Sequence, residues 1–257
     1  MPDLLQLLEW DSAFFGSRIA RLHANRLDPD LLRQTEDWCR AARIDCLYFL
    51  ADADHDDTVL LAEAAGFHLV DLRLTFDRKL AAPPMTGIYQ PATPDIRLAT
   101  AADIPQLRAM AGANHHDSRF YFDRRFPRAL CDELYATWVE KSCTGYADAL
   151  LVADRDGTAV GYLSCHLRPE QCGQIGLVGM HESMQGQGLG RKLVDESLRW
   201  FSSAGATRVE VVTQGRNAAA QRLYQQAGFK TRTLQLWYHR WFAPHTPTSI
   251  QDGATGR

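Results

Sequence analysis

Six residues, Gln185–Gly190, form the stretch of this sequence best suited to bind phosphate. They read Gln-Gly-Gln-Gly-Leu-Gly, between an apolar run expected as a strand (175–180) and an amphipathic run expected as a helix (189–200). Glycine permits turns that a β-carbon would block, and it opens backbone N–H groups to close approach. A helix start adds free N–H groups and a positive dipole end. The spacing predicts a diphosphate site; the alternative is a glycine-rich turn without a ligand.

A second informative segment, Asn217–Phe229, follows an expected strand at 208–213. Asn217 is well placed to cap a helix, and Gly228 is well placed to end it. Three residues of this helix fall on one face, at positions i, i+3 and i+4: Ala220, Leu223 and Tyr224. Without further context, Tyr224 is interpreted as a core tyrosine.

The two segments together resemble the GCN5-related N-acetyltransferase (GNAT) superfamily, through the patterns (Gln/Arg)-x-x-Gly-x-(Gly/Ala) and Asn-x6-Tyr-x3-Gly-Phe. Dinucleotide-binding and nucleoside-triphosphate loops have different signatures. The resemblance implies acetyl-CoA as acyl donor and Tyr224 as the catalytic proton donor. It departs from many members in having Met180-His181-Glu182-Ser183 in place of Val-x-Pro. The implied cofactor-binding residues are Val178, Gly179, Met180, Gln185, Gly186, Gln187, Gly188, Leu189, Gly190, Arg191, Asn217 and Leu223.

Two other segments bear on the acceptor. The stretch Leu8–Ala20, with its Trp-x3-Phe-Phe-Gly, and the region from Ser118 to Glu140 resemble GNAT enzymes that act on nucleotide-linked amino sugars. The resemblance implies direct acetyl transfer, in a ternary complex, to the amine of a dTDP-linked amino-deoxy sugar used in cell-surface polysaccharide biosynthesis. The candidate acceptor-binding residues are Ser118, Arg119 and Phe120. A guanidinium such as that of Arg119 matches phosphate oxygens, whereas Phe120 has core packing as its alternative.

Other functions stay open at this point: acetylation of a protein N-terminus, an aminoglycoside or another small amine, or a non-catalytic CoA-binding module. An acidic acceptor loop would favour an aminoglycoside, but residues 119–128 are rich in arginine. The retained Tyr224 argues against the non-catalytic module. His181 is the nearest candidate base, and a water chain is the default. His115 and His116 are adjacent and have no spaced partner, so we interpret them as loop residues and predict no metal site.

Bulk composition excludes several classes of protein. The formal net charge is −3, with no basic stripe, so a nucleic-acid surface is not expected. The first residues lack the features of a secretion signal, and no segment has the apolar length of a membrane helix. Six scattered cysteines indicate reduced thiols in a cytoplasmic protein. The expected partners are acetyl-CoA and an amino sugar nucleotide, with a homodimer as one possible assembly.

The chain divides at a proline-rich linker, residues 81–95. We predict an N-terminal domain over 1–80, a catalytic domain over 96–243 and a tail over 244–257 with little to bury. The expected order of elements after residue 96 is β-αα-βββ-α-β-α-β. This order matches the GNAT fold, an α/β (α+β) architecture with a mixed, mostly antiparallel sheet and flanking helices.

A segment of the N-terminal domain is similar in sequence to a segment of the catalytic domain. Ala65–Arg78 and Ala227–Arg240 align without gaps at an offset of 162 residues. The shared positions predict a smaller, degenerate GNAT-like α/β domain. In that register His55 and Ala62 replace Asn217 and Tyr224, and no glycine loop precedes residue 81. The N-terminal domain is therefore not expected to bind CoA in this way.

Overall fold

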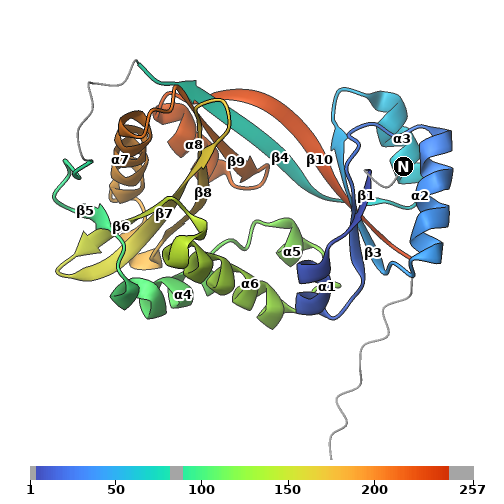
Figure 1. Cartoon of the computed structure of the whole chain (residues 1–257), viewed down its shortest axis with the longest axis horizontal. Coiled ribbons are helices and arrows are strands. Elements are labelled where there is room, and N and C mark those ends of the chain that lie inside the picture. Colours follow the sequence, from blue (N-terminus) through green and yellow to red (C-terminus); the bar gives the residue numbers. More distant parts are fainter. Residues whose placement is uncertain (1–3, 82–88, 243–257) are drawn as a thin grey trace, which may run out of the picture.

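A computed structural model describes residues 4–81 and 89–242 (Figure 1). Its strands are β1 (Leu5–Leu7), β2 (Ile19–Leu22), β3 (Cys46–Asp52), β4 (His68–Lys79), β5 (Ile96–Leu98), β6 (Ala149–Arg155), β7 (Thr158–Arg168), β8 (Cys172–Met180), β9 (Arg208–Gln214) and β10 (Lys230–Trp241). Its α-helices are α1 (Glu9–Phe15), α2 (Pro29–Ala41), α3 (Asp56–Ala64), α4 (Ile104–Gly112), α5 (Arg119–Phe122), α6 (Arg128–Lys141), α7 (Leu189–Ser203) and α8 (Ala218–Gln226). The predicted tail and part of the predicted linker, residues 82–88, lie outside the described residues.

The ten strands of the described chain form one sheet in the order β1-β2-β3-β10-β4-β9-β8-β7-β6-β5. The pairs β2–β3 and β8–β9 are parallel, and the other neighbours are antiparallel. The mixed, mostly antiparallel sheet with flanking helices that the sequence predicts is therefore confirmed. None of the helices within the described ranges is long and apolar enough to cross a membrane.

The two halves of the chain exchange strands. β4, from the first 80 residues, lies between β9 and β10, and β10, from the end of the chain, lies between β3 and β4. In Figure 1, β4 and β10 run side by side from the α7–α8 group to the α2–α3 group. The linker therefore separates two segments of sequence that share a single sheet.

The exchange has an internal two-fold symmetry. Arg73 pairs with Gln235, which lies 162 residues further along the chain. The strands on either side of this pair are related in the same way. Asp52 of β3 pairs with Gln235, and its counterpart at the same offset, Gln214 of β9, pairs with Arg73. The bounds of β3, α3 and β4 recur at the same offset as those of β9, α8 and β10. The offset found in the sequence thus corresponds to a structural repeat centred on the β4–β10 pair.

The two faces of the sheet carry different layers. On one face, an apolar core around Phe76 and Val211 lies under α7 and α8, and a second core around Tyr238 lies under α2 and α3. The opposite face packs against α1, α4, α5 and α6, through a core that includes Tyr48 and Phe120. Alternation along β10 assigns Tyr238 to the first face and Trp237 to the second.

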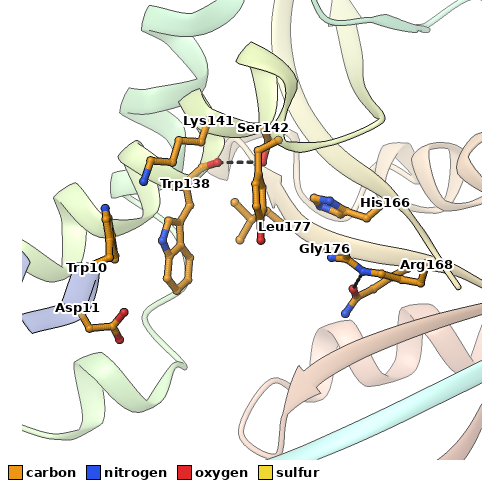
Figure 2. Close-up of a pocket in the computed structure, with 11 residues that line it drawn as sticks. Trp10, Asp11, Trp138, Lys141, Ser142, His166, Arg168, Gly176 and Leu177 are labelled. Atoms are coloured by element: carbon orange, nitrogen blue, oxygen red, sulfur yellow. Dashed lines mark hydrogen bonds between the residues drawn. The ribbon is translucent and has the colours of Figure 1, made fainter. Parts of the chain in front are cut away.

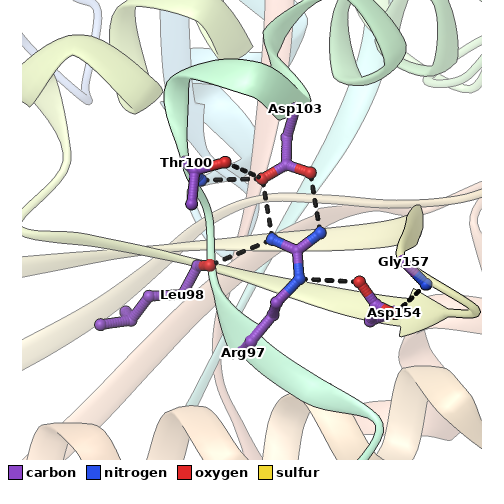
Figure 3. Close-up of polar contacts among 6 residues, drawn as sticks. All are labelled: Arg97, Leu98, Thr100, Asp103, Asp154 and Gly157. Atoms are coloured by element: carbon purple, nitrogen blue, oxygen red, sulfur yellow. Dashed lines mark hydrogen bonds and ion pairs between the residues drawn. The ribbon is translucent and has the colours of Figure 1, made fainter.

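An ion-pair network fixes the start of the segment that follows the linker (Figure 3). The Arg97 guanidinium donates to both carboxylate oxygens of Asp103 at 2.8 Å and, through Nε, to Asp154 at 2.7 Å. Asp103 also accepts from the backbone N–H and the hydroxyl of Thr100. These bonds connect β5, β6 and the first turn before α4. They hold the pKa of Asp103 down at about 2, chiefly through the hydrogen bond from Arg97.

We expect Arg97→Met to lower the free energy of unfolding by about 2 kcal/mol at pH 7, because it leaves a buried carboxylate without its charged partner. Since the folded-state pKa of Asp103 is depressed, this stabilisation is complete above pH ~4 and disappears as the pH falls toward 2. Denaturant unfolding at pH 7 and pH 3 measures both effects. Arg222→Met, at an exposed position on α8, is the control. Equal stability of the two variants at pH 7 would contradict the assignment.

Candidate active site

The central feature of the site is the point where β8 and β9 separate. The two strands pair in parallel from Cys172↔Arg208 to Ile175↔Val211, and within the described residues the pairing goes no further. Beyond that point β9 continues to pair with β4, whereas β8 continues along β7. Residues 176–180 of β8 therefore have one edge turned away from β9, where their backbone groups can bind another molecule.

A bulge in β8 marks the same point. The register of β7 against β8 shifts between Leu163↔Val178 and Cys165↔Ile175. Ser164 lies opposite this irregularity, and its hydroxyl accepts a hydrogen bond from the backbone N–H of Leu177 at 2.8 Å. Gly176 cannot carry a side chain here, because a β-carbon would lie 2.6 Å from Ser164 Oγ and from His166 Nε2. The bulge therefore keeps the backbone at Gly176 accessible.

The glycine loop has the geometry of an anion site. Gly186 and Gly188 have φ values of +75° and +80°, in the left-handed region that favours glycine. Gly188 is the N-cap of α7 and provides no side chain to cap it. Among the described residues, the N–H groups from Gly186 to Arg191 have no hydrogen-bond partner. Six free N–H groups at the start of a fifteen-residue helix fit a pyrophosphate.

Helix α8 positions the remaining predicted cofactor residues. The Asn217 side chain caps the helix by accepting from the N–H of Ala220 at 2.9 Å, and Gly228 follows its end with φ +81°. Leu223 reaches the start of α7, since a β-carbon on Gly190 would lie 3.6 Å from it. The expected helix, its cap and its end are confirmed.

Tyr224 is 3% exposed and lies in the core between the sheet and helices α7 and α8. The same core contains Ile175 and Val211, the last pair before β8 and β9 separate. Burial raises the pKa of Tyr224, so the phenol is protonated at neutral pH. In the part of the chain that the structure describes, its hydroxyl forms no hydrogen bond. Tyr224 is thus a core residue whose hydroxyl is protonated and able to donate.

The other predicted loop residues have specific local roles. The Arg191 side chain pairs with Asp195 and donates to the carbonyl of Gln226, so it connects α7 to the end of α8. The Gln187 side chain donates to the carbonyl of Ser183, while Gln185 is exposed. Val178 and Met180 pack against the α7 core, and Gly179 is held against the Tyr162 ring.

A pocket opens on the other face of the sheet, beside the bulge (Figure 2). Its cavity volume is about 430 Å³, within the range of small-molecule sites. Trp10 and Trp138 lie on one side, and Arg168 and His166 lie on the other. Gly176 and Leu177 of β8 belong to its lining, so the pocket reaches the strand that borders the β8–β9 opening. The Lys141 ammonium lies 4.3 Å from the Trp10 ring.

His166 is the imidazole of this pocket. It is 5% exposed, and burial, with the charge of Arg168, lowers its pKa, so it is neutral at pH 7. Its Nε2 lies 3.1 Å from the Ser164 hydroxyl. Because that hydroxyl already accepts from Leu177, its own hydrogen is available to His166 Nε2. His181 is also occupied, since its Nδ1 caps the short turn Glu182–Met184 by accepting from the N–H of Ser183.

The structure separates the three predicted acceptor residues. Arg119, at the start of α5, is half-buried on the same sheet face as the pocket. Ser118 and Phe120 are each 3% exposed, and Phe120 packs among Phe15, Phe126 and Tyr48. Only Arg119 of the three therefore presents polar atoms near solvent.

The adjacent histidines lie in the loop between α4 and α5. His115 stacks on Tyr135 and lies 2.8 Å from the Tyr162 hydroxyl, and burial lowers its pKa to about 4. No group of three or more potential metal ligands occurs within residues 4–81 and 89–242.

Comparison with known proteins relates the chain to acetyltransferases. Residues 112–229 match the Acetyltransferase (GNAT) family. The chain is 29% identical over 243 residues to the dTDP-fucosamine acetyltransferase of Escherichia coli O6:H1, covering 92% of this chain and 97% of that protein. It is 26% identical over 165 residues to the spore coat polysaccharide biosynthesis protein SpsD of Bacillus subtilis, covering 63% of this chain and 56% of that protein. A solved GCN5-related N-acetyltransferase from Sphaerobacter thermophilus superposes with a TM-score of 0.63 at 17% identity, covering 94% of this chain and 77% of that one.

Residues 112–229 therefore form an acetyltransferase domain of the GNAT family, and the fold is that of a solved GCN5-related N-acetyltransferase. It is an N-acetyltransferase, and GNAT acetyltransferases use acetyl-CoA as the acyl donor. The free N–H groups of the glycine loop and the edge of β8 that is turned away from β9 fit such a donor. Both present backbone groups that can form hydrogen bonds with it.

Proposed function

We propose that the enzyme acetylates the amine of a nucleotide-linked amino sugar, with a dTDP-linked sugar as the preferred acceptor. The observation that carries this proposal is the pocket beside Gly176, which lies on the sheet face opposite the glycine loop's helix. It combines two tryptophans with Lys141, Arg168 and polar groups, a mixture suited to a sugar next to an anion. The likeness to dTDP-fucosamine acetyltransferase and SpsD supports the same acceptor class.

In the proposed reaction, acetyl-CoA supplies the activated acetyl group. The amine nitrogen forms a bond to the acetyl carbon while the carbon–sulfur bond breaks. The glycine loop and the N-terminus of α7 hold the diphosphate of the donor, and the free edge of residues 178–180 binds the adjoining amides and polarises the thioester. Tyr224 gives its hydroxyl proton to the departing sulfur.

The amine must lose a proton before it attacks. His166 Nε2 faces the Ser164 hydroxyl, and His181 Nδ1 serves as a cap, so neither of these two nitrogens is a free base. We therefore assign this proton to water in the pocket.

A panel of acceptors tests the proposal. With acetyl-CoA saturating, we expect kcat/KM for dTDP-fucosamine to exceed that for the corresponding free amino sugar by at least roughly 100-fold, because the free sugar makes no phosphate contacts. An aminoglycoside and a peptide with a free N-terminus complete the panel. Release of CoA thiol and the mass of the product are measured together. Preferential acetylation of the peptide or the aminoglycoside would overturn the proposal.

A further inference from the structure

Three arginines from distant parts of the sequence meet on the sheet face that carries the pocket. Arg21 lies on β2, Arg73 on β4 and Arg119 at the start of α5. The guanidinium carbons of Arg21 and Arg119 lie 5.2 and 4.7 Å from the ring centre of Trp237 on β10. Arg73 and Trp237 lie on the same face, because Arg73 pairs with Gln235. We call these three residues the arginine cluster.

The arginine cluster has no anionic partner of its own. None of its members forms an ion pair within residues 4–81 and 89–242. Arg73 donates to the neutral oxygens of Thr75 and Gln235, and Arg21 Nε is buried without a hydrogen-bond partner. Arg21 and Arg119 repel each other, and burial together with the charge of Arg119 lowers the pKa of Arg21. Half-buried like charges without compensation are costly, and a bound anion would relieve that cost.

Arg119 is held in place by a neutral partner. Asp123 accepts hydrogen bonds at 2.7 Å from His239 Nδ1 and at 2.9 Å from Trp241. This bond places the imidazole hydrogen on Nδ1, so Nε2 is free to accept from Arg119 at 2.9 Å. The guanidinium also lies 4.2 Å from the ring centre of Tyr48. Arg119 is thus fixed in position, and it forms no ion pair among the described residues.

The acids of this face leave the cluster positive. Asp71 pairs with Arg216 at 3.4 Å, and Asp52 pairs with Arg26 at 3.6 Å. Asp123 is occupied by His239 and Trp241. Asp11, on α1, is the acid that lines the pocket, and its pKa is raised by burial against the opposing effect of Arg119. Phe120 connects the cluster to the pocket, because its ring centre lies 4.0 Å from the Arg119 guanidinium carbon and 6.0 Å from the ring centre of Trp138, which lines the pocket.

We propose that the arginine cluster binds the diphosphate of the acceptor nucleotide, so that the N-terminal half supplies two of the three phosphate-binding side chains. This inference rests on the proposed function for the choice of acceptor, but the anion site itself can be tested without catalysis. A guanidinium fork and a pyrophosphate form paired, charge-assisted hydrogen bonds. The Trp237 ring, which lies near two of the arginines, would contact the bound nucleotide beside the phosphates.

Calorimetric titration of dTDP into the CoA-saturated enzyme tests the site, because CoA then fills the glycine loop. We expect Arg21→Met and Arg73→Met each to weaken dTDP binding by roughly ten- to a hundredfold. Arg21→Lys should restore part of the affinity, which a purely structural role for the side chain would not predict. Arg33→Met, an exposed position on α2, removes the same charge elsewhere and should leave binding unchanged. Circular dichroism confirms that each variant is folded.

Inorganic pyrophosphate, titrated in the same way, separates this proposal from the proposed function. Binding of pyrophosphate that depends on Arg21 and Arg73, with no acetylation of any nucleotide-linked sugar, would support the anion site and contradict the proposed acceptor. Acetylation of dTDP-fucosamine with unchanged dTDP affinity in both methionine variants would overturn the anion site alone. Failure of the CoA-saturated wild type to bind dTDP and pyrophosphate would also overturn it.

Discussion

Replacing Tyr224 by phenylalanine should lower turnover roughly 10²- to 10⁴-fold while leaving affinity for acetyl-CoA nearly unchanged. One general acid contributes about this much to catalysis. The phenylalanine ring keeps the contacts of Tyr224 with Phe76 and Phe229, so the core stays packed. Because the hydroxyl forms no hydrogen bond among the described residues, its loss should cost little stability. Steady-state turnover and CoA calorimetry on the same preparation measure the two quantities.

Tyr238→Phe is the matched control for this experiment. Tyr238 is also buried, but it lies in the core beneath α2 and α3 rather than beside the β8–β9 opening. Its variant should keep wild-type turnover. If Tyr224→Phe also turned over at the wild-type rate across the pH range, another group would have to protonate the leaving sulfur.

Gly188→Val should abolish measurable CoA binding without unfolding the chain. A β-carbon at Gly188 would meet nothing within 4 Å, so the substitution does not act through a steric clash in the free protein. It acts through the backbone, because φ is +80° and a β-branched residue strongly disfavours that conformation. When the loop relaxes to another conformation, its N–H groups no longer converge on one anion. Calorimetry with CoA gives the readout.

Gly205→Val separates loss of the loop from loss of stability. Gly205 follows the other end of α7, has φ +85°, and a β-carbon there would also meet nothing within 4 Å. Both variants should lose similar amounts of stability, but only Gly188→Val should lose CoA. Unchanged CoA affinity in a folded Gly188→Val protein would place the donor elsewhere.

The donor side of the site could be predicted from the sequence because its signals are local. Each signal lies within a few residues of the helix end that it determines. The glycine loop precedes the start of α7, Asn217 caps α8, and Gly228 follows its end. Hydrogen bonding and backbone preference act at that range, so the element types and their ends follow from short stretches of residues. The assignment of Tyr224 to catalysis stays a prediction.

The acceptor side depends on contacts that no local pattern reveals. Arg21 and Arg73 are polar residues within strands of alternating character, and nothing near them in the sequence distinguishes them from other polar residues. Only the position of β10 between β3 and β4 brings them to the same face as Trp237. His166 occupies one more alternating position, in β7, and becomes a pocket residue through its closeness to Gly176. The repeat offset could be read from the sequence, but the exchange of strands could not. When two equivalent strands pair with each other in an antiparallel way, the sequence of neither strand indicates that pairing.

The strand exchange also constrains the order in which the protein can fold during synthesis. When β3, α3 and β4 leave the ribosome, the strand that must fill the gap between β3 and β4 is still about 150 residues from being made. At roughly 5–20 residues per second, synthesis of the intervening residues takes on the order of ten seconds. During this interval β3 and β4 each present an open edge to other chains in the cell. Chaperone binding to the nascent N-terminal half is therefore expected to persist until β10 has been synthesised.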